Sequence, residues 1–172
     1  IGVELNGGDN SVVQKDIFNK NNISVYIRDG SENNTIRRNV IVNNSDGIVV
    51  DGDNSQIKDN RIENNNGATG VHVNATANNT RVVGNFFIKN IPQANDSGTN
   101  TAWNDTTRGN CWSDLRTNPG FPHFYFINII NATHNATDYR PCGINARFTG
   151  TAKGGLIKIQ DFTSFKKNTT SV

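Results

Sequence analysis

The sequence predicts an all-β protein: a right-handed parallel β-helix of about four to five coils, followed by a C-terminal β or irregular segment that serves as a cap or an assembly surface. Three observations support this fold class: a repeat of nearly constant length, short β-branched packets within each repeat, and asparagine at fixed positions between them. A chain of 172 residues is long enough for one domain with its own core. We divide it into coils and closing motif, residues 1–114, and a C-terminal segment, residues 115–172.

Four apolar packets recur along the first half of the chain. They begin at Gly2, Ser24, Gly47 and Gly70, so successive steps are 22, 23 and 23 residues. A second packet follows each of them and contains the pairs Ile17–Phe18, Val40–Ile41, Arg61–Ile62 and Phe86–Phe87. The packets are too short and too β-branched for helices. Since a sandwich would not keep a fixed repeat length, the spacing favours the stacked coils of a solenoid.

Apolar and polar residues alternate within the first packet of each coil, as expected for a strand with one buried face. The residues expected to point into the core are Val3, Leu5, Val25, Ile27, Ile48, Val50, Val71 and Val73. The residues expected to point outward, where they form an ordinary mixed surface, are Glu4, Tyr26, Val49 and His72.

The repeat is expected to break after the fourth coil. Residues 91–108 are rich in Asn, Thr and Gly and are interpreted as a loop. Apolar residues return at 121–130 and in two short runs nearer the C-terminus. A terminal coil exposes core and backbone unless something covers it, so we expect Phe124, Phe126 and Ile130 to pack on the open end as a cap.

Asparagine recurs at two corners of each coil. One column consists of Asp16, Asn39, Asn60 and Asn85, and the other of Asn21, Asn44, Asn65 and Asn90. Asparagine tolerates the left-handed backbone conformations that a tight corner needs. Equivalent corners stack, so each amide can donate to one neighbour and accept from the other. We therefore interpret both columns as structural ladders rather than binding sites.

The end of the repeats carries a second motif, "NTAW" at 100–103 and "GNCWSD" at 109–114. Together with the repeats it resembles the NosD-like family of right-handed β-helix proteins, over roughly Gly2 to Asp114. The residues that carry the match are Trp103, Gly109, Asn110, Trp112, Ser113 and Asp114. The resemblance implies an exported β-helix that this motif closes, and it points more weakly to a polysaccharide partner. Trp103 and Trp112 either stack on sugars or pack inside, and their place in the closing motif favours packing.

The family takes its name from a periplasmic copper-associated member. The present sequence has no Met, and its three histidines, His72, His123 and His134, are scattered. Cys111 stands where the family usually has an aromatic residue. We therefore expect no copper site, no other metal and no cofactor.

Two cysteines, Cys111 and Cys142, lie 31 residues apart, a spacing that matches no metal-binding or redox motif. In a secreted chain they would form a disulfide, and in the cytosol they would be two buried thiols. The chain starts at Ile1, so we interpret it as a processed mature chain or an excised piece.

Asn-x-Ser/Thr sequons are enriched. The chain contains ten, where about 30 Asn and about 25 Ser plus Thr would give roughly four by chance. Nine lie at expected corners and loops, where a glycan leaves the core undisturbed: Asn22, Asn33, Asn74, Asn78, Asn95, Asn104, Asn131, Asn135 and Asn168. The tenth, Asn43, adjoins a ladder and is the least convincing. Multiple N-glycosylation predicts an extracellular, secreted or cell-surface protein.

Catalytic signatures are weak. Asp51 and Asp53 in "DGDN" are interpreted as turn residues, because no carboxylate is expected at the matching places of the adjacent coils. A basic pair of columns, Gln14/Arg37/Lys58 beside Lys15/Arg38/Asp59, is either a solvated face or a contact for an acidic glycan or a neighbouring subunit through Arg37, Arg38 and Lys58. The sequence has no nucleic-acid motif, and no apolar run reaches the roughly 18 residues of a membrane helix.

These observations favour a glycosylated structural β-helix over an enzyme. Since "IGVEL" enters the first coil at once, we expect either that the chain is a fragment of a longer solenoid or that another subunit covers this end. Head-to-tail assembly of copies, as a filament or surface layer, is the favoured expectation. A carbohydrate-binding module is the alternative, and a polysaccharide lyase, hydrolase or epimerase using Asp51 or Asp53 comes third.

Overall fold

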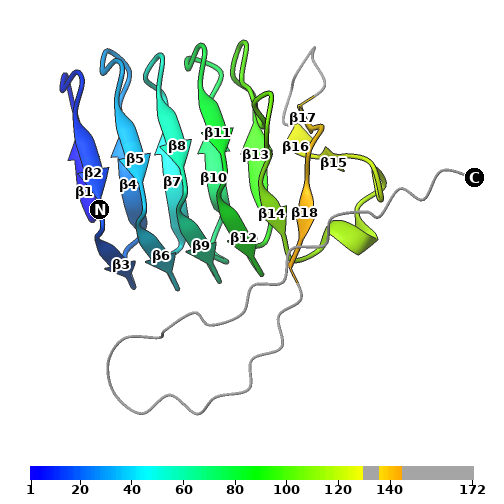
Figure 1. Cartoon of the computed structure of the whole chain (residues 1–172). Helices are drawn as coiled ribbons and strands as arrows, with labels where there is room; N and C mark the ends of the chain where they lie inside the picture. Colours follow the sequence, from blue (N-terminus) through cyan, green and yellow to red (C-terminus); the bar gives the residue numbers. More distant parts are fainter. Residues whose placement is uncertain (130–135, 145–172) are drawn as a thin grey trace, which may run out of the picture.

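The computed structural model describes residues 1–129 and 136–144, which form an all-β parallel solenoid of about five coils with a small antiparallel sheet at its C-terminal end (Figure 1). The predicted fold class is confirmed. The described residues contain no α-helix and only a short 3-10 turn, η1 (Leu115–Thr117). The predictions made for Ile130, Asn131, Asn135 and Asn168 lie outside the described residues.

Three parallel sheets run along the solenoid. Each of the first four coils contributes one strand to each sheet, and the fifth coil contributes strands to sheets 1 and 3 and only a bridge to sheet 2. Sheet 1 consists of β1 (Val3–Leu5), β4 (Ile23–Ile27), β7 (Asp46–Val50), β10 (Thr69–Val73), β13 (Ala94–Asp96) and β16 (Asn128–Ile129). Sheet 2 consists of β2 (Val12–Gln14), β5 (Thr35–Arg37), β8 (Gln56–Lys58) and β11 (Arg81–Val83). Sheet 3 consists of β3 (Ile17–Asn19), β6 (Val40–Val42), β9 (Arg61–Glu63), β12 (Phe86–Ile88), β14 (Cys111–Trp112) and β18 (Cys142–Gly143).

The register between neighbouring coils is constant, so identical positions stack into columns. In sheet 1, Val25 pairs with Ile48 and Ile48 with Val71, and all three side chains are fully buried. The outward column departs from the prediction at Val49, which is only 7% exposed. Val49 is paired with Tyr26 on one side and His72 on the other, and it is small beside these neighbours.

The predicted break after the fourth coil is wrong. Within residues 91–108, strand β13 pairs with β10, and bridges join Asn78 to Thr99 and Arg81 to Ala102, so this segment begins a fifth coil. Strand β14 then continues sheet 3 on β12. The pattern was missed because β13 reads Ala-Asn-Asp instead of an apolar packet.

A cap is present at the C-terminal end, but the side chains that face inward are not the predicted ones. Phe124 and Phe126 are 38% and 46% exposed, whereas Tyr125 and Ile127 are buried in the core. The Tyr125 ring stacks on Trp112 at 3.9 Å between centroids, and Trp112 stacks on Phe87 at 4.2 Å. The cap therefore uses the opposite face of the 121–130 run, because a one-residue slip in a strand exchanges its two faces. Strand β15 (Tyr125–Phe126) pairs antiparallel with β17 (Thr137–Asp138).

Residues with positive φ mark the three corners of each of the first four coils and the first corner of the fifth, and Gly7 and Gly30 add a second one at the first corner of coils one and two. The first corner uses asparagine in five successive coils: Asn10, Asn33, Asn54, Asn79 and Asn100. The second uses Lys15, Arg38, Asp59 and Gly84, and the third uses Lys20, Asn43, Asn64 and Lys89. The residues of the two predicted asparagine columns directly follow those at the second and third corners. The asparagine column at the first corner was not predicted.

Candidate functional site

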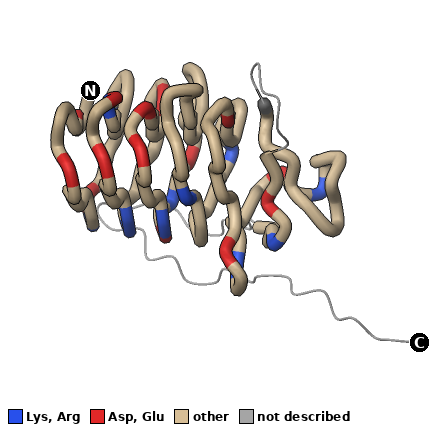
Figure 2. The backbone as a smooth tube through the Cα atoms, turned by 90° about the horizontal axis from the view of Figure 1, so that it is seen from above, with Lys and Arg blue, Asp and Glu red and all other residues tan. Residues whose placement is uncertain are grey.

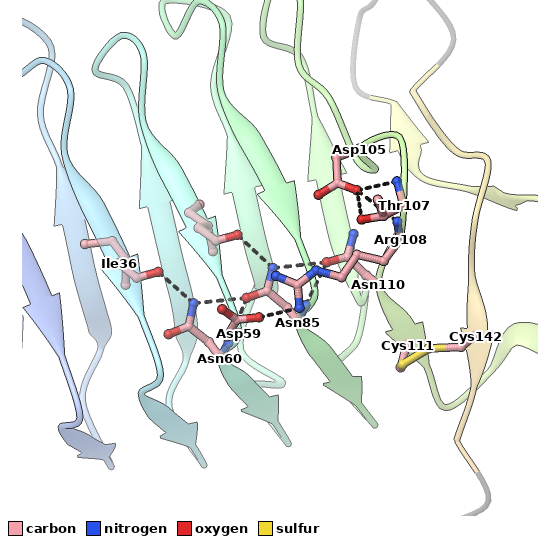
Figure 3. A network of polar contacts seen from close by, with 11 residues as sticks. Ile36, Asp59, Asn60, Asn85, Asp105, Thr107, Arg108, Asn110, Cys111 and Cys142 are labelled. Atoms are coloured by element: carbon pink, nitrogen blue, oxygen red, sulfur yellow. Dashed lines mark hydrogen bonds and ion pairs between the residues drawn. A yellow bond between two sulfur atoms is a disulfide. The ribbon is translucent and has the colours of Figure 1, made fainter. Parts of the chain in front are cut away.

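The asparagine ladders lie inside the solenoid and connect one coil to the next. Asn60 donates to Asn85 Oδ1 from both its backbone N and its Nδ2, each over 3.0 Å, and also from Nδ2 to the Ile36 carbonyl over 2.9 Å (Figure 3). Asn85 repeats this pattern on Asn110 and on the Ile57 carbonyl. Both side chains are fully buried. Each amide thus satisfies backbone groups that a corner leaves without a partner.

This ladder ends in the closing motif. Asn110 donates from its backbone N to Asp138 Oδ2 over 2.7 Å, and from Nδ2 to the Trp103 carbonyl over 2.7 Å. A carboxylate is a suitable last acceptor because it accepts several hydrogen bonds and donates none. The sequence placed Asn110 in the closing motif but did not show that it continues the ladder, nor that Asp138 ends it.

The second ladder, Asn21 to Asn90, ends on Gln93. The backbone N and Nδ2 of Asn90 donate to Gln93 Oε1 over 3.1 and 2.9 Å. Gln93 Nε2 in turn donates to Ser113 Oγ and Asp114 Oδ1. The Ser-Asp pair of the closing motif therefore holds the residue that terminates this ladder.

Both tryptophans of the motif are core residues. Trp103 and Trp112 are 1% and 0% exposed, and their indole nitrogens donate to the buried carboxylates of Asp96 and Asp138 over 2.7 and 3.0 Å. Burial raises the pKa of Asp138, against the effect of the N–H groups that bind its carboxylate. Neither indole can stack on a sugar from solution.

The disulfide between Cys111 and Cys142 ties the last two strands of sheet 3 together (Figure 3). The two residues are register partners on β14 and β18, so the bridge staples the terminal segment to the fifth coil. A structural disulfide is typical of proteins outside the cytoplasm.

Among the described sequons, three asparagines are exposed, and their side chains make no hydrogen bond to a described residue: Asn22, Asn33 and Asn43. Asn22 and Asn43 lie at the third corner of adjacent coils, and Asn33 lies at the first corner. Asn43, the sequon least expected from the sequence, is therefore as accessible as the other two.

The remaining described sequons are engaged. Three half-buried asparagines each donate a side-chain N–H to an aspartate: Asn74 to the Asp51 side chain, Asn78 to the Asp53 side chain, and Asn104 to the Asp105 carbonyl. Asn95 is 7% exposed and its Oδ1 accepts from Asn128 Nδ2 over 2.7 Å. Attachment of a glycan at these positions would remove or crowd contacts that the fold uses.

The basic columns lie on the outer face of sheet 2 and the corner beside it. Arg37 and Lys58 are register partners, and each makes a hydrogen bond to a glutamine, Gln14 and Gln56 respectively. Arg38 is exposed at the corner, where Asp59 pairs with Arg108 over 2.7 Å. In Figure 2 the basic segments of the first coils line up along one edge of the solenoid and the acidic segments along another.

Asp51 and Asp53 hold neighbouring coils together. Asp51 accepts from the Tyr26 hydroxyl over 2.5 Å and from Asn74, and its hydrogen bond raises the pKa of Tyr26. Asp53 accepts from the backbone N and the Nδ2 of Asn78. Both carboxylates thus have structural partners on the adjacent coils.

The donor set of the described residues does not fit copper. Within residues 1–129 and 136–144, no three His, Cys, Asp or Glu side chains gather around a common point. Both thiols are consumed by the disulfide, and the sequence has no Met. In the same part of the chain, no helix is long and apolar enough to cross a membrane.

A comparison with protein families supplies one match. The model of the family described as periplasmic copper-binding protein (NosD) matches residues 1–117. No curated protein and no solved structure matches the chain.

Proposed function

Since the chain belongs to the NosD family of parallel β-helices, we propose that it is a structural glycoprotein outside the cytoplasm, secreted or displayed on the cell surface, and not an enzyme. The periplasmic location in the family's description and the disulfide support the compartment. The copper binding in that description is not carried over, because the donors in the described part of this chain do not suit the ion.

One observation carries the structural role: the polar side chains that the sequence concentrates at the corners bind one another. The buried ladder from Asn39 to Asp138 crosses the successive coils, and the tryptophans and the disulfide lie at its end. Gln93 ends the second ladder in the same way. A polar network with its partners satisfied rigidifies a core and specifies one structure. Such a rod suits mechanical support or protection.

Electron microscopy of the native, undigested material tests this role. A structural protein is expected in an ordered assembly with a regular axial repeat, in which the strand edge of β1, β2 and β3 meets the C-terminal end of another copy. Dispersed single particles would contradict the assembly. Cleavage of a polysaccharide that Asp51→Asn or Asp53→Asn abolishes would contradict the non-enzymatic role.

A carbohydrate-binding role is the second candidate, and the stacked cations of sheet 2 favour it. Arg37 and Lys58 lie side by side, and in the part of the chain that the structure describes their hydrogen-bond partners are neutral glutamines, so they can attract an anionic polymer along the solenoid. Saturable binding of an acidic polysaccharide should be lost in the Arg37→Ala plus Lys58→Ala variant. Binding that survives this double change rules out the basic columns as the site.

A further inference from the structure

A hollow of about 600 Å³ lies where the fifth coil meets the segment just after β17, away from the basic columns. Its walls come from three places: Arg81 on β11, the corner segment 104–106, and Tyr139 with Arg140 just after β17. Asn104 Oδ1 accepts from the Tyr139 backbone N over 3.2 Å, which ties two of these walls together. The hollow is therefore fixed by the fold and lies outside the closing motif.

The hollow is lined by two positively charged side chains and one negatively charged one. Arg81 and Arg140 are exposed, and neither guanidinium forms an ion pair with a residue in the described part of the chain. Asp105 Oδ1 is bound by the backbone N and Oγ1 of Thr107 and by the backbone N of Arg108 (Figure 3). These hydrogen bonds, with those to Thr107 first, lower the pKa of Asp105 to about 2. Two free cations thus face one carboxylate that its own turn already engages.

An aromatic ring completes the hollow. Tyr139 is 60% exposed, and Phe124 supports its ring edge-on at 5.4 Å between centroids. An exposed, supported ring offers a flat apolar surface at low entropic cost. The polar groups of Asn104 and Thr106 lie on the same rim and can exchange hydrogen bonds with hydroxyls.

We propose that this hollow binds a carboxylate-bearing sugar, with Arg81 and Arg140 on the carboxylate and Tyr139 under the apolar face of the pyranose ring. Guanidinium groups match a carboxylate geometrically by donating two parallel hydrogen bonds. The ring gives a preference for a sugar over a simple inorganic anion. The site goes beyond the structural role, and it is separate from the columns of Arg37 and Lys58.

The test is a titration of the protein with trigalacturonate, and with neutral galactotriose as the matched probe. Binding is measured by calorimetry and NMR. We expect binding of trigalacturonate that the double change Arg81→Gln plus Arg140→Gln weakens at least about tenfold, as loss of charge-assisted hydrogen bonds requires. Arg140→Lys should give an intermediate affinity, because it keeps the charge and loses the fork. The matched control is Lys20→Gln, which removes an exposed cation at the third corner of the first coil, outside both candidate sites, and should bind as the unchanged protein does.

Tyr139→Ala should weaken binding while Tyr139→Phe retains it. Chemical shifts that move on the unchanged protein should centre on Tyr139 and Asn104, a readout that needs no variant to fold. Equal affinity for the neutral probe, an unaffected double variant, or shifts centred on Arg37 would each overturn the proposal.

The sequon at Asn104 lies on the rim, so the titration is made on the glycosylated chain and on the deglycosylated chain. Binding by both supports a site for a free sugar acid. Binding only after deglycosylation means that the chain's own sugar fills the hollow, which overturns the proposal. Because the structural role is tested by microscopy, either proposal can fail without the other.

Discussion

Replacing Asn85 by alanine tests whether the buried ladder holds the coils together. The change removes Oδ1, which is the acceptor for two buried donors, the backbone N–H of Asn60 and one N–H of its side-chain amide. Each buried donor left without a partner costs about 1–3 kcal/mol, so the free energy of unfolding should fall by about 2–6 kcal/mol. That is a large part of the roughly 5–15 kcal/mol that typical domains possess.

Urea unfolding, followed by circular dichroism and by the fluorescence of the buried tryptophans, measures this loss. The matched control is Asn79→Gly in the exposed column, where φ is 55° and the side chain donates one long bond of 3.3 Å to Asn54. Glycine accepts this backbone conformation, so the control should stay within about 1 kcal/mol of the unchanged protein. Asn85→Asp should be worse than Asn85→Ala, because it sets a buried carboxylate against Asn110 Oδ1. If Asn85→Ala costs no more than Asn79→Gly, the ladder does not stabilise the fold.

Three further predictions concern the closing end and the surface. Replacing both Cys111 and Cys142 by serine should lower the free energy of unfolding in urea by about 4 kcal/mol, because the bridge no longer restricts the unfolded chain over a 31-residue separation. A loss under about 1 kcal/mol would mean that strand pairing alone holds β18. Asp138 has a raised pKa in the folded state, so its protonated form stabilises the fold below the ordinary value of 3.8, and this stabilisation is lost as the pH rises through the raised pKa. The unfolding free energy of the unchanged protein minus that of Asp138→Asn should therefore fall from pH 3.5 to 7. A value that stays constant or rises with pH contradicts this. Mass spectrometry of glycopeptides from native material should find sugar on the exposed sequons, Asn22, Asn33 and Asn43, and none on buried Asn95. Sugar on Asn95 without sugar on the exposed sequons would contradict the use of exposure to predict glycosylation.

The fold could be predicted from the repeat because stacked coils place equivalent residues at a nearly constant spacing in the sequence. Periodicity failed where the fifth coil places Asp96 at the inward position that Val73 occupies in the fourth coil. The buried carboxylate accepts a hydrogen bond from Trp103, a partner that the repeat does not reveal. It failed again in the cap, where both faces of 121–130 are apolar and alternation cannot tell Tyr125 from Phe124. The exposed asparagine column was detectable, because its members follow steps close to those of the packets.

The ends of the ladders could not be predicted from periodicity. Asp138 lies 28 residues from Asn110 in a segment without a repeat, and Gln93 differs from the asparagines that it follows. The hollow lined by Tyr139 depends on the same long-range docking, so no local pattern marks it. In both cases the contact joins parts of the chain that share no spacing rule.

The amides of the ladder all point the same way along the solenoid. In Asn60, Asn85 and Asn110, Oδ1 accepts from the backbone N–H and one side-chain N–H of the ladder residue before it, and one side-chain N–H donates to a carbonyl of the preceding coil. Beyond Asn110, the carboxyl group of Asp138 takes the same acceptor position. A whole coil could therefore be inserted into the ladder or deleted from it without disturbing this order, whereas a coil shifted by one residue would leave donors and acceptors without their partners.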